Sequence, residues 1–339
     1  MNTLLFRQLQ LKFLATPWVL GSLAILVCLL APLVGPTPIK LSRVFDNSVS
    51  FADNVDAQIF FIARLPRVLA GALVGGSLAA AGVVLQALLR NPLATPFTLG
   101  VSAGASLGAM VVIVLGIPFA LAGLPAVTLA SFIGSLVAVG IVYFLARLRR
   151  QGLSTTVLLL AGVTLNSLFS AIIMFVQYLA DFSQNFQAVR WLMGNLDVSG
   201  YEPILWALPL LMAALVGFTY LPRSLNLLTL GTEYAATRGV DVLNTQRLAF
   251  LSASLATGAA VSLGGPIGFI GIIVPHIVRL LVGADNRVVL PSATFLGAAF
   301  LVTCDVGART IMAPLELPVG VITAMLGGPF FLWLLIRNR

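Results

Sequence analysis

The stretch LAFLSASLATGAAVSLGGPIGFIGIIVPHIV, residues 248–278, contains no charged side chain over 31 residues. As one straight α-helix it would be about 46 Å long, because each residue adds 1.5 Å. A bilayer's hydrocarbon core is only about 30 Å thick. Gly264, Gly265, Pro266 and Gly268 lie near its middle and provide a break. We therefore predict two membrane-embedded helices joined at this glycine- and proline-rich point.

The composition indicates that the rest of the chain is also embedded in a membrane. Of 339 residues 59% are hydrophobic and 9% are charged, with a mean hydropathy of +1.06, whereas a soluble domain carries about 25% charged residues. We predict one all-α, polytopic membrane domain over residues 1–339, with a retained first span rather than a cleaved signal peptide. The ten predicted spans are 17–34, 66–89, 97–115, 121–146, 153–179, 201–221, 246–263, 269–283, 288–307 and 316–336.

The basic residues predict the orientation. With the N-terminus in the cytoplasm, 13 of the 19 Lys and Arg residues fall inside and six outside. Cytoplasmic loops carry the excess of basic residues, so both termini are predicted to be cytoplasmic. The inside set is Arg7, Lys12, Arg90, Arg147, Arg149, Arg150, Arg223, Arg238, Arg247, Arg279, Arg287, Arg337 and Arg339. The outside set is Lys40, Arg43, Arg64, Arg67, Arg190 and Arg309.

Two interruptions suggest internal symmetry. The second span ends at RNPLATPFTLGVSAGASLGA (90–109) and the seventh at GGPIGFIGIIVPHIVR (264–279), on opposite sides of the membrane. Paired interruptions of this kind are typical of inverted repeats that surround a transport path. The alternative is that glycine and proline are simply common in membrane helices.

Chemistry-bearing residues are scarce, which excludes several classes of protein. The chain has one histidine, His276, and neither an H-E-x-x-H nor a G-x-S-x-G motif, so we predict no enzyme and no metal site. Carboxylates are almost absent from the interior of the spans; Asp305 is the candidate there, with Arg309 one turn away. Ion-coupled transporters usually keep ionisable groups at mid-membrane, and the chain lacks a phosphate-binding loop for ATP. Energy for transport is expected from a partner.

Two further features bear on partners and bonds. Cys28 and Cys304 both fall in apolar runs and are expected to be free thiols. The longest inside loop, RSLNLLTLGTEYAATRGVDVLNTQR (223–247), is rich enough in Ala, Leu and Thr to form one or two short helices on which a partner could dock. The alternative is an interfacial loop that only packs under the bundle. Only two lysines and no basic–aromatic cluster argue against a nucleic-acid partner.

Six ordered motifs resemble those of one family. They are RLPRVLAGALVGGSLAAAGVVLQALLRNPLATPFTLGVSAGASLGA (64–109), LLLAGV (158–163), LLTLGTEYAATRGV (227–240), GGPIGFIGIIVPHIVRLL (264–281), DVGAR (305–309) and LELPVGVITAMLGGPFFLWLL (315–335). The chain resembles the permease subunits of the bacterial ABC importers for ferric siderophores, haem and vitamin B12.

The resemblance implies an inner-membrane permease that works by alternating access. It implies a second permease subunit (an identical copy or a close paralogue), two ATPase subunits that use the ATP, and one periplasmic binding protein. No cofactor is expected on this chain itself. Ferric siderophore is the expected cargo and iron transport the expected process, with haem or cobalamin as alternatives and molybdate-type oxyanions further off. An ATPase-independent secondary transporter and an intramembrane enzyme are the competing classes.

The resemblance also assigns residues. Arg64, Arg67 and Arg309 match the family's outer arginines, which bind glutamates of the binding protein, and a planar guanidinium suits a carboxylate. The alternatives are that Arg67 or Arg309 anchors its own helix, or that Arg309 pairs with Asp305. Residues 227–240 match the family's coupling helices. The expected ATPase contacts are Leu227, Gly231, Glu233, Ala235, Arg238 and Gly239, with the three small residues forming one strip at i, i+4 and i+8.

The remaining assignments concern the path. Asn91 and Thr155 match positions that narrow its cytoplasmic end, with helix capping as the alternative for Thr155. Gly162, Gly320 and Ala324 are expected to line the path on the fifth and tenth spans. His276 lies in the VPHIVR motif, which the family shares whatever its cargo. We expect it to be structural, bonding a carbonyl freed by Pro275 or packing on a neighbouring helix.

Overall fold

The computed structural model describes residues 3–46, 48–117, 120–121, 124–147, 155–198 and 200–337. The elements in chain order are α1 (Thr3–Leu30), the 3-10 helix η1 (Ala31–Leu33), α2 (Leu41–Val44), α3 (Val55–Gln58), the π-helix η2 (Ile59–Arg64), α4 (Leu65–Leu89), the 3-10 helix η3 (Pro96–Leu99), α5 (Val101–Val114), β1 (Ala120–Leu121), β2 (Leu124–Pro125), α6 (Ala126–Arg147), α7 (Thr155–Leu179), α8 (Phe182–Leu192), α9 (Glu202–Tyr220), α10 (Pro222–Leu230), α11 (Thr232–Thr237), α12 (Val242–Gly264), α13 (Ile270–Val282), α14 (Asn286–Thr310) and α15 (Val319–Arg337).

The ten predicted spans are all present as helices. Seven helical stretches in the described part of the chain are long and apolar enough to cross a membrane, and the three shorter apolar helices Val101–Val114, Ile270–Val282 and Val319–Leu334 supply the others. Their ends fall within a few residues of the predicted boundaries, with two exceptions. Helix α1 begins at Thr3, well before the predicted start at residue 17, and α6 begins at Ala126, after the β1–β2 hairpin that the sequence did not predict. The all-α prediction is confirmed apart from this pair of two-residue strands.

The predicted break between α12 and α13 is confirmed. Gly265 has a φ of +66° and Phe269 a φ of +67°, both left-handed, and Pro266 between them has no N–H to donate. The Gly264 carbonyl, freed by the end of the helix, accepts a 2.8 Å hydrogen bond from the Asn195 backbone N–H. The break therefore satisfies a backbone group that lipid could not.

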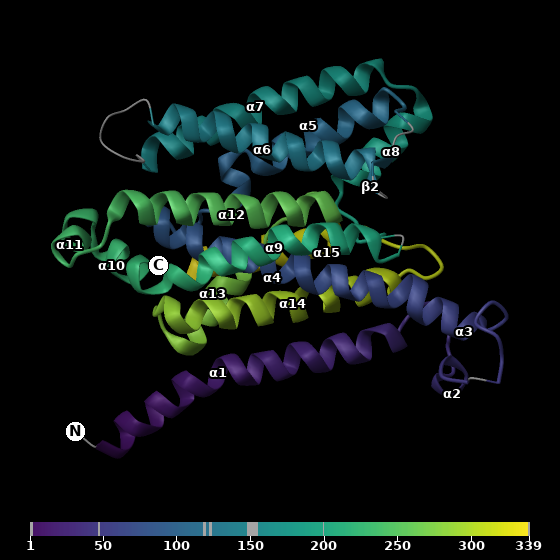
Figure 1. Ribbon diagram of the computed structural model, residues 1–339, viewed down its shortest axis with the longest axis horizontal. Helices are drawn as coiled ribbons and strands as arrows, with labels where there is room; N and C mark the ends of the chain where they lie inside the picture. The colour runs from purple at the N-terminus through teal and green to yellow at the C-terminus, as the bar shows by residue number, and fades with distance from the viewer. Residues whose placement is uncertain are drawn as a thin grey trace.

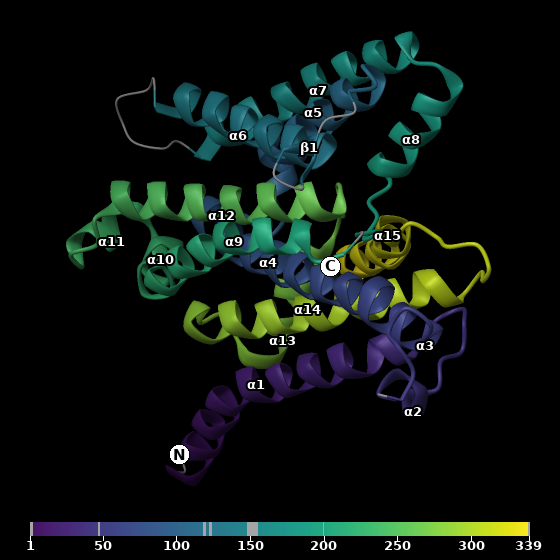
Figure 2. The same ribbon diagram turned by 45° about the vertical axis from the view of Figure 1, so that its right-hand side comes forward.

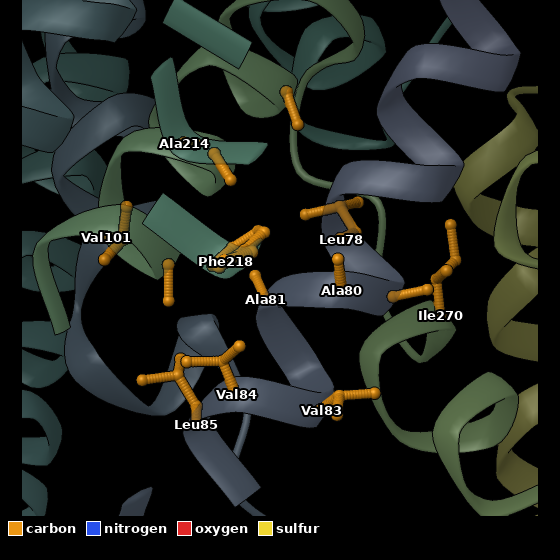
Figure 3. Close-up of a cluster of buried hydrophobic side chains, with 14 of the residues drawn as sticks. Leu78, Ala80, Ala81, Val83, Val84, Leu85, Val101, Ala214, Phe218 and Ile270 are labelled. Atoms are coloured by element: carbon orange, nitrogen blue, oxygen red, sulfur yellow. The ribbon is translucent and has the colours of Figure 1, made fainter. Parts of the chain in front are cut away.

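Helix α4 lies at the centre of the bundle and is buried along nearly its whole length. Glycines let neighbouring backbones approach it closely: a Cβ on Gly75 would lie 2.7 Å from the Leu301 Cβ of α14. Figure 3 shows the core around this helix, where α4 side chains lie among Val101, Ala214, Phe218 and Ile270 of other elements.

The bundle has two ends of different character (Figure 1). The short helices α10 and α11 lie at one end, and α2, α3, α8 and the loop before α15 lie at the other. Figure 2 shows the same division after rotation. Among the described residues, the predicted inside loops meet at the α10–α11 end and the predicted outside loops at the α8 end. Pro118, Arg149, Arg150 and Arg339 lie outside the described residues.

The two long helices that precede the interruptions, α4 and α12, end at opposite ends of the bundle, as the sequence indicated (Figure 1). The segments that follow them meet, since Pro96 and Phe97 line the same cavity as Ile267 and Gly268. The first interruption joins α4 to η3 and the short helix α5, and its turn begins at Arg90, which has a φ of +48°. The second joins α12 to the short helix α13. In each, the interruption follows a long buried helix and precedes a helix of 13 or 14 residues. This arrangement agrees with two inverted-repeat-like halves.

Candidate functional site

A buried ionic cluster lies at the α8 end of the bundle. The Arg67 Nε donates to Asp305 Oδ1 at 2.8 Å and its Nη1 donates to Glu316 Oε2 at 2.6 Å. The Arg309 Nε lies 3.0 Å from the other Asp305 oxygen. The Asp305 side chain is 1% exposed, whereas that of Glu316 is 44% exposed. The cluster ties α4 to α14 and to the loop that precedes α15.

Arg64 lies at the same end and is also engaged within the chain. Its guanidinium donates to the Pro32 carbonyl at 3.0 Å and to the Thr37 carbonyl. Arg309 Nη2 donates to the Ala31 carbonyl at 3.4 Å. These bonds hold the chain that follows α1 against η2 and α14.

The structure therefore brings the three predicted docking arginines together but leaves none of them freely exposed. Arg64, Arg67 and Arg309 are 5%, 7% and 3% exposed. The pairing of Arg309 with Asp305, which the sequence left as an alternative, is present. Docking on a binding protein stays a prediction, and it would require these guanidinium groups to become accessible. Lys40, Arg43 and Arg190 are the exposed basic residues at this end.

The predicted coupling segment forms two short helices, α10 and α11. Gly231 separates them with a φ of +135°, and Gly239 follows α11 with a φ of +80°. The expected strip of Gly231, Ala235 and Gly239 on one helix face is therefore wrong, because both glycines lie outside the helix and Ala235 is fully buried. The positive φ of each accounts for the two glycines, and no other part of the described chain comes within 4 Å of a Cβ built at either one.

Exposed side chains on α11 face away from the bundle. Glu233 and Arg238 are exposed, and the Arg238 guanidinium lies 5.3 Å from the Tyr234 ring centroid. Leu227 of α10 is half-buried against the core. Of the six predicted contacts, Glu233 and Arg238 are thus the side chains best placed to reach a partner.

A polar junction that the sequence did not reveal fastens α10 to α14. Asn226 of α10 donates to Asp285 Oδ1 at 2.7 Å, and its own oxygen accepts from the backbone and side-chain nitrogens of Asn286, both at 2.9 Å. Asp285 caps α14, and the side-chain hydrogen bond from Arg287 lowers its pKa to about 2, with help from the Arg287 backbone N–H and Asn226. The signal in the sequence was the cap itself, ADNR before an apolar run.

The predicted gate residues lie at the α10–α11 end. The Asn91 oxygen accepts from the Leu93 backbone N–H at 2.9 Å, in the turn after α4. Thr155 is the first described residue of α7 and is half-buried. Beside Asn91, the Gln86 side chain of α4 donates to the Gly271 carbonyl at 2.9 Å and accepts from Arg279 of α13.

Two of the three predicted path residues serve packing within the chain. Gly162 of α7 is buried, and a Cβ there would lie 2.7 Å from the Leu99 Cα. Gly320 of α15 is buried against the loop at Met193, and its N–H donates to the Gly194 carbonyl at 3.2 Å. The expectation that they widen the path is therefore wrong for this chain. Ala324 is exposed on α15.

His276 packs on a neighbouring helix. Its ring lies edge-on to Phe330 of α15, with 6.2 Å between centroids. This agrees with the structural role expected for it. Among the described residues, no group of three His, Cys, Asp or Glu side chains is placed to hold a metal ion, and Cys28 and Cys304 are free.

The sequence analysis did not predict helix α8. Asp181 and Gln184 form a capping box at its start, with hydrogen bonds of 2.8 and 3.0 Å. A carboxylate followed three residues later by glutamine is a start signal for a helix, here in a stretch between two apolar spans.

Known proteins are similar to this chain in sequence, and one solved structure is similar in fold. Residues 23–337 match the FecCD transport family. The chain is 40% identical over 328 residues to the hemin transport system permease protein HmuU of Yersinia pestis, covering 94% of this chain and 96% of that protein. It is 38% identical over 337 residues to the vitamin B12 import system permease protein BtuC of Vibrio cholerae, covering 99% and 98%. A solved inward-facing conformation of a metal-chelate type ABC transporter has 31% identity and a TM-score of 0.82, covering 95% of this chain and 98% of that one.

Proposed function

The chain belongs to the FecCD transport family, and we propose that it is the permease subunit of an ABC importer that carries a ferric siderophore across a bacterial inner membrane. The resemblance to ABC importer permeases is confirmed by the matches over nearly the whole chain. The observation that carries the mechanism is the hydrogen-bonded junction between α10 and the start of α14 in the transmembrane bundle.

Movement at α10–α11 would reach the membrane helices through this connection. Asn226 and Asp285 join α10 to the start of α14, and α14 packs along the central helix α4 through Gly75 and Gly297. Closely packed elements transmit displacement because a packed interior compresses little. An ATPase that closes on α11, through Glu233 and Arg238, would thus displace α14 and α4 as bodies. Asn91 and Thr155 are the proposed cytoplasmic constriction.

The α8 end is the proposed docking face for a periplasmic binding protein. It exposes the carboxylates Asp46, Asp53 and Asp181 and the basic residues Lys40, Arg43 and Arg190. Arg64, Arg67 and Arg309 are buried at the same end. Acidic side chains of a binding protein would meet the exposed basic residues first and then compete with Glu316 for Arg67. A second permease subunit would complete the path, with Ala324 on the exposed side of α15.

Haem and cobalamin are the alternative cargoes. Relatives of similar identity are named for hemin and for vitamin B12, so the cargo requires a direct comparison. An ATPase-independent secondary transporter is the competing mechanism. It would need ionisable groups at mid-membrane, whereas the ion pairs of Arg67 and Arg309 with Asp305 lie at one end of the bundle.

The decisive test is uptake into proteoliposomes that hold this chain with its ATPase and binding protein. Labelled ferric siderophores, haem and cobalamin would be offered in parallel, with and without ATP. We expect uptake of one cargo that stops without the ATPase. Uptake that persists without the ATPase would refute the importer and favour a secondary transporter.

A matched pair of variants tests the coupling segment. Glu233→Arg reverses an exposed charge on α11, and Asp53→Arg reverses an exposed charge at the opposite end. We expect Glu233→Arg to reduce co-purification of the ATPase with the chain, while Asp53→Arg leaves it unchanged. Equal ATPase recovery with both variants would contradict a contact at Glu233.

A further inference from the structure

A pocket of about 310 Å³ opens at the α10–α11 end, between the end of α4, the end of α10 and the turn that joins α13 to α14. Its polar lining includes Gln86, Arg90, Thr229, Arg279 and Asn286. Sites for small molecules usually occupy about 300–1,000 Å³. This pocket is at the bottom of that range, so it suits a headgroup or a small anion and not a bulky chelate cargo.

The pocket carries positive charge that the chain does not neutralise. Arg279 is partly buried, and its side-chain partner is the neutral amide oxygen of Gln86. Arg90 is exposed at the rim. No Asp or Glu lines the pocket, and no carboxylate among the described residues forms an ion pair with either arginine. The buried Arg67 and Arg309, in contrast, share Asp305. A guanidinium removed from water without a counter-charge is costly, so the pocket favours an anion.

Asn286 adds a second requirement. It is 3% exposed, it lines the pocket, and its side-chain oxygen is buried without a hydrogen-bond partner. Its amide nitrogen already donates to Asn226, so the group left without a partner is a hydrogen-bond acceptor. The nearby carboxylate of Asp285 is occupied by Arg287 at 2.6 Å. A ligand that satisfies every lining group therefore carries an anionic centre and also a hydrogen-bond donor.

Exposed leucines beside the pocket indicate where such a ligand comes from. Leu280 and Leu281 follow Arg279 on α13 and are 71% and 63% exposed, and Leu230 follows Thr229 and is 69% exposed. An apolar surface that adjoins a basic pocket at the cytoplasmic boundary suits a phospholipid, whose acyl chains would lie on the leucines. A free phosphate would use the arginines and leave the leucines uncovered.

We propose that this pocket binds the headgroup of an anionic inner-leaflet phospholipid that bears a hydroxyl, of the phosphatidylglycerol type. The phosphate contacts Arg90 and Arg279, and a headgroup hydroxyl donates to the Asn286 side-chain oxygen. The bound lipid neutralises the pocket where α4, α10 and the α13–α14 turn meet. This inference does not depend on the cargo or on the binding protein.

The test is native mass spectrometry of the full-length chain, purified from vesicles of defined composition. Phosphatidylglycerol is compared with phosphatidic acid, which lacks the glycerol headgroup and its alcohol hydroxyls, and with phosphatidylcholine, which lacks net charge. We expect phosphatidylglycerol to be retained best. Arg90→Gln should weaken retention about fivefold, since a basic residue near anionic lipid contributes about 1 kcal/mol. Arg279→Gln should act likewise, but Arg90 is exposed and its replacement does not threaten folding.

Arg223→Gln is the matched control, because Arg223 is an exposed arginine of α10 that does not line the pocket. Equal retention of phosphatidylglycerol in Arg90→Gln and Arg223→Gln would overturn the proposal, as would equal retention of phosphatidylcholine. Release of the lipid by inorganic phosphate would assign the pocket to a free anion. Release on addition of the ATPase subunit would assign it to an acidic side chain of that partner.

Discussion

Asp305→Asn isolates the energetic role of the buried ionic cluster. Asparagine has nearly the shape of aspartate, so the change removes a charge without leaving a cavity. Arg67 keeps Glu316 at 2.6 Å, but Arg309 keeps only the 3.4 Å bond to the Ala31 carbonyl. Removing one partner of a buried ion pair costs about 3–5 kcal/mol because the other charge is left uncompensated. Since only Arg309 loses its counter-charge, we expect the lower limit, about 3 kcal/mol.

Thermal unfolding of the purified chain in detergent measures this cost. At about 2 °C per kcal/mol, the scale for large domains, the apparent melting temperature should fall by about 6 °C. The double variant Asp305→Leu, Arg309→Met replaces the pair by apolar side chains and should recover most of the loss, since buried pairs are often replaceable in this way.

An unchanged melting temperature for Asp305→Asn would refute this reasoning. It would mean that the arginines are held weakly and are free to serve a partner, in which case the variant would alter only affinity for the binding protein. A double variant no more stable than Asp305→Asn would show that the loss comes from backbone packing around α14 and not from the orphaned guanidinium.

Two further predictions concern packing and pH. Gly75→Ala should destabilise the chain by about 1–3 kcal/mol, because the new Cβ would lie 2.7 Å from the Leu301 Cβ, whereas Gly140→Ala, with nothing within 4 Å, should be neutral or slightly stabilising in the same thermal measurement. The pKa of Asp285 is lowered from 3.8 to about 2, so its ionised form stabilises the fold fully above about pH 4 and the contribution is lost as pH falls toward 2. Unfolding measured across that range should lose part of its pH dependence in Asp285→Asn, and an identical pH profile would contradict the junction with Arg287.

The spans were predictable because the features that set them are local. A run of apolar residues long enough to cross a bilayer has one low-energy conformation there, a helix with its backbone bonds satisfied internally. The break at residues 265–269 was equally local, since Gly265 and Pro266 cannot continue a helix without loss. Helix α8 had a local signal as well, the capping box at Asp181. The stretch is polar and lies between two long apolar runs, so hydropathy does not indicate a helix there.

Only part of the ionic cluster was predictable, because one of its contacts is local in the sequence and the other is not. Asp305 and Arg309 are four residues apart, so their contact can be anticipated from helical geometry. Arg67 lies 238 positions from Asp305, and no spacing rule joins them. A resemblance assigned the arginines a partner outside the chain, and the chain contains carboxylates and carbonyls that already occupy them.

The glycines show that the sequence alone does not reveal why a small residue is needed at a given position. The sequence does not distinguish between Gly75, Gly162, Gly231 and Gly320. Each is compatible with close approach of another helix or of a partner. In the structure Gly75 and Gly162 admit a neighbouring backbone of the same chain, Gly320 admits the Met193–Gly194 turn, and Gly231 supplies a φ of +135° between two helices. A missing Cβ indicates that something comes near or that the backbone turns. Which of these applies is decided by helices far away in the sequence, so residues that face a path can be identified only after those that face the core have been excluded. By that criterion Ala324, exposed on α15, is the one of the three proposed path residues that can still contact a cargo.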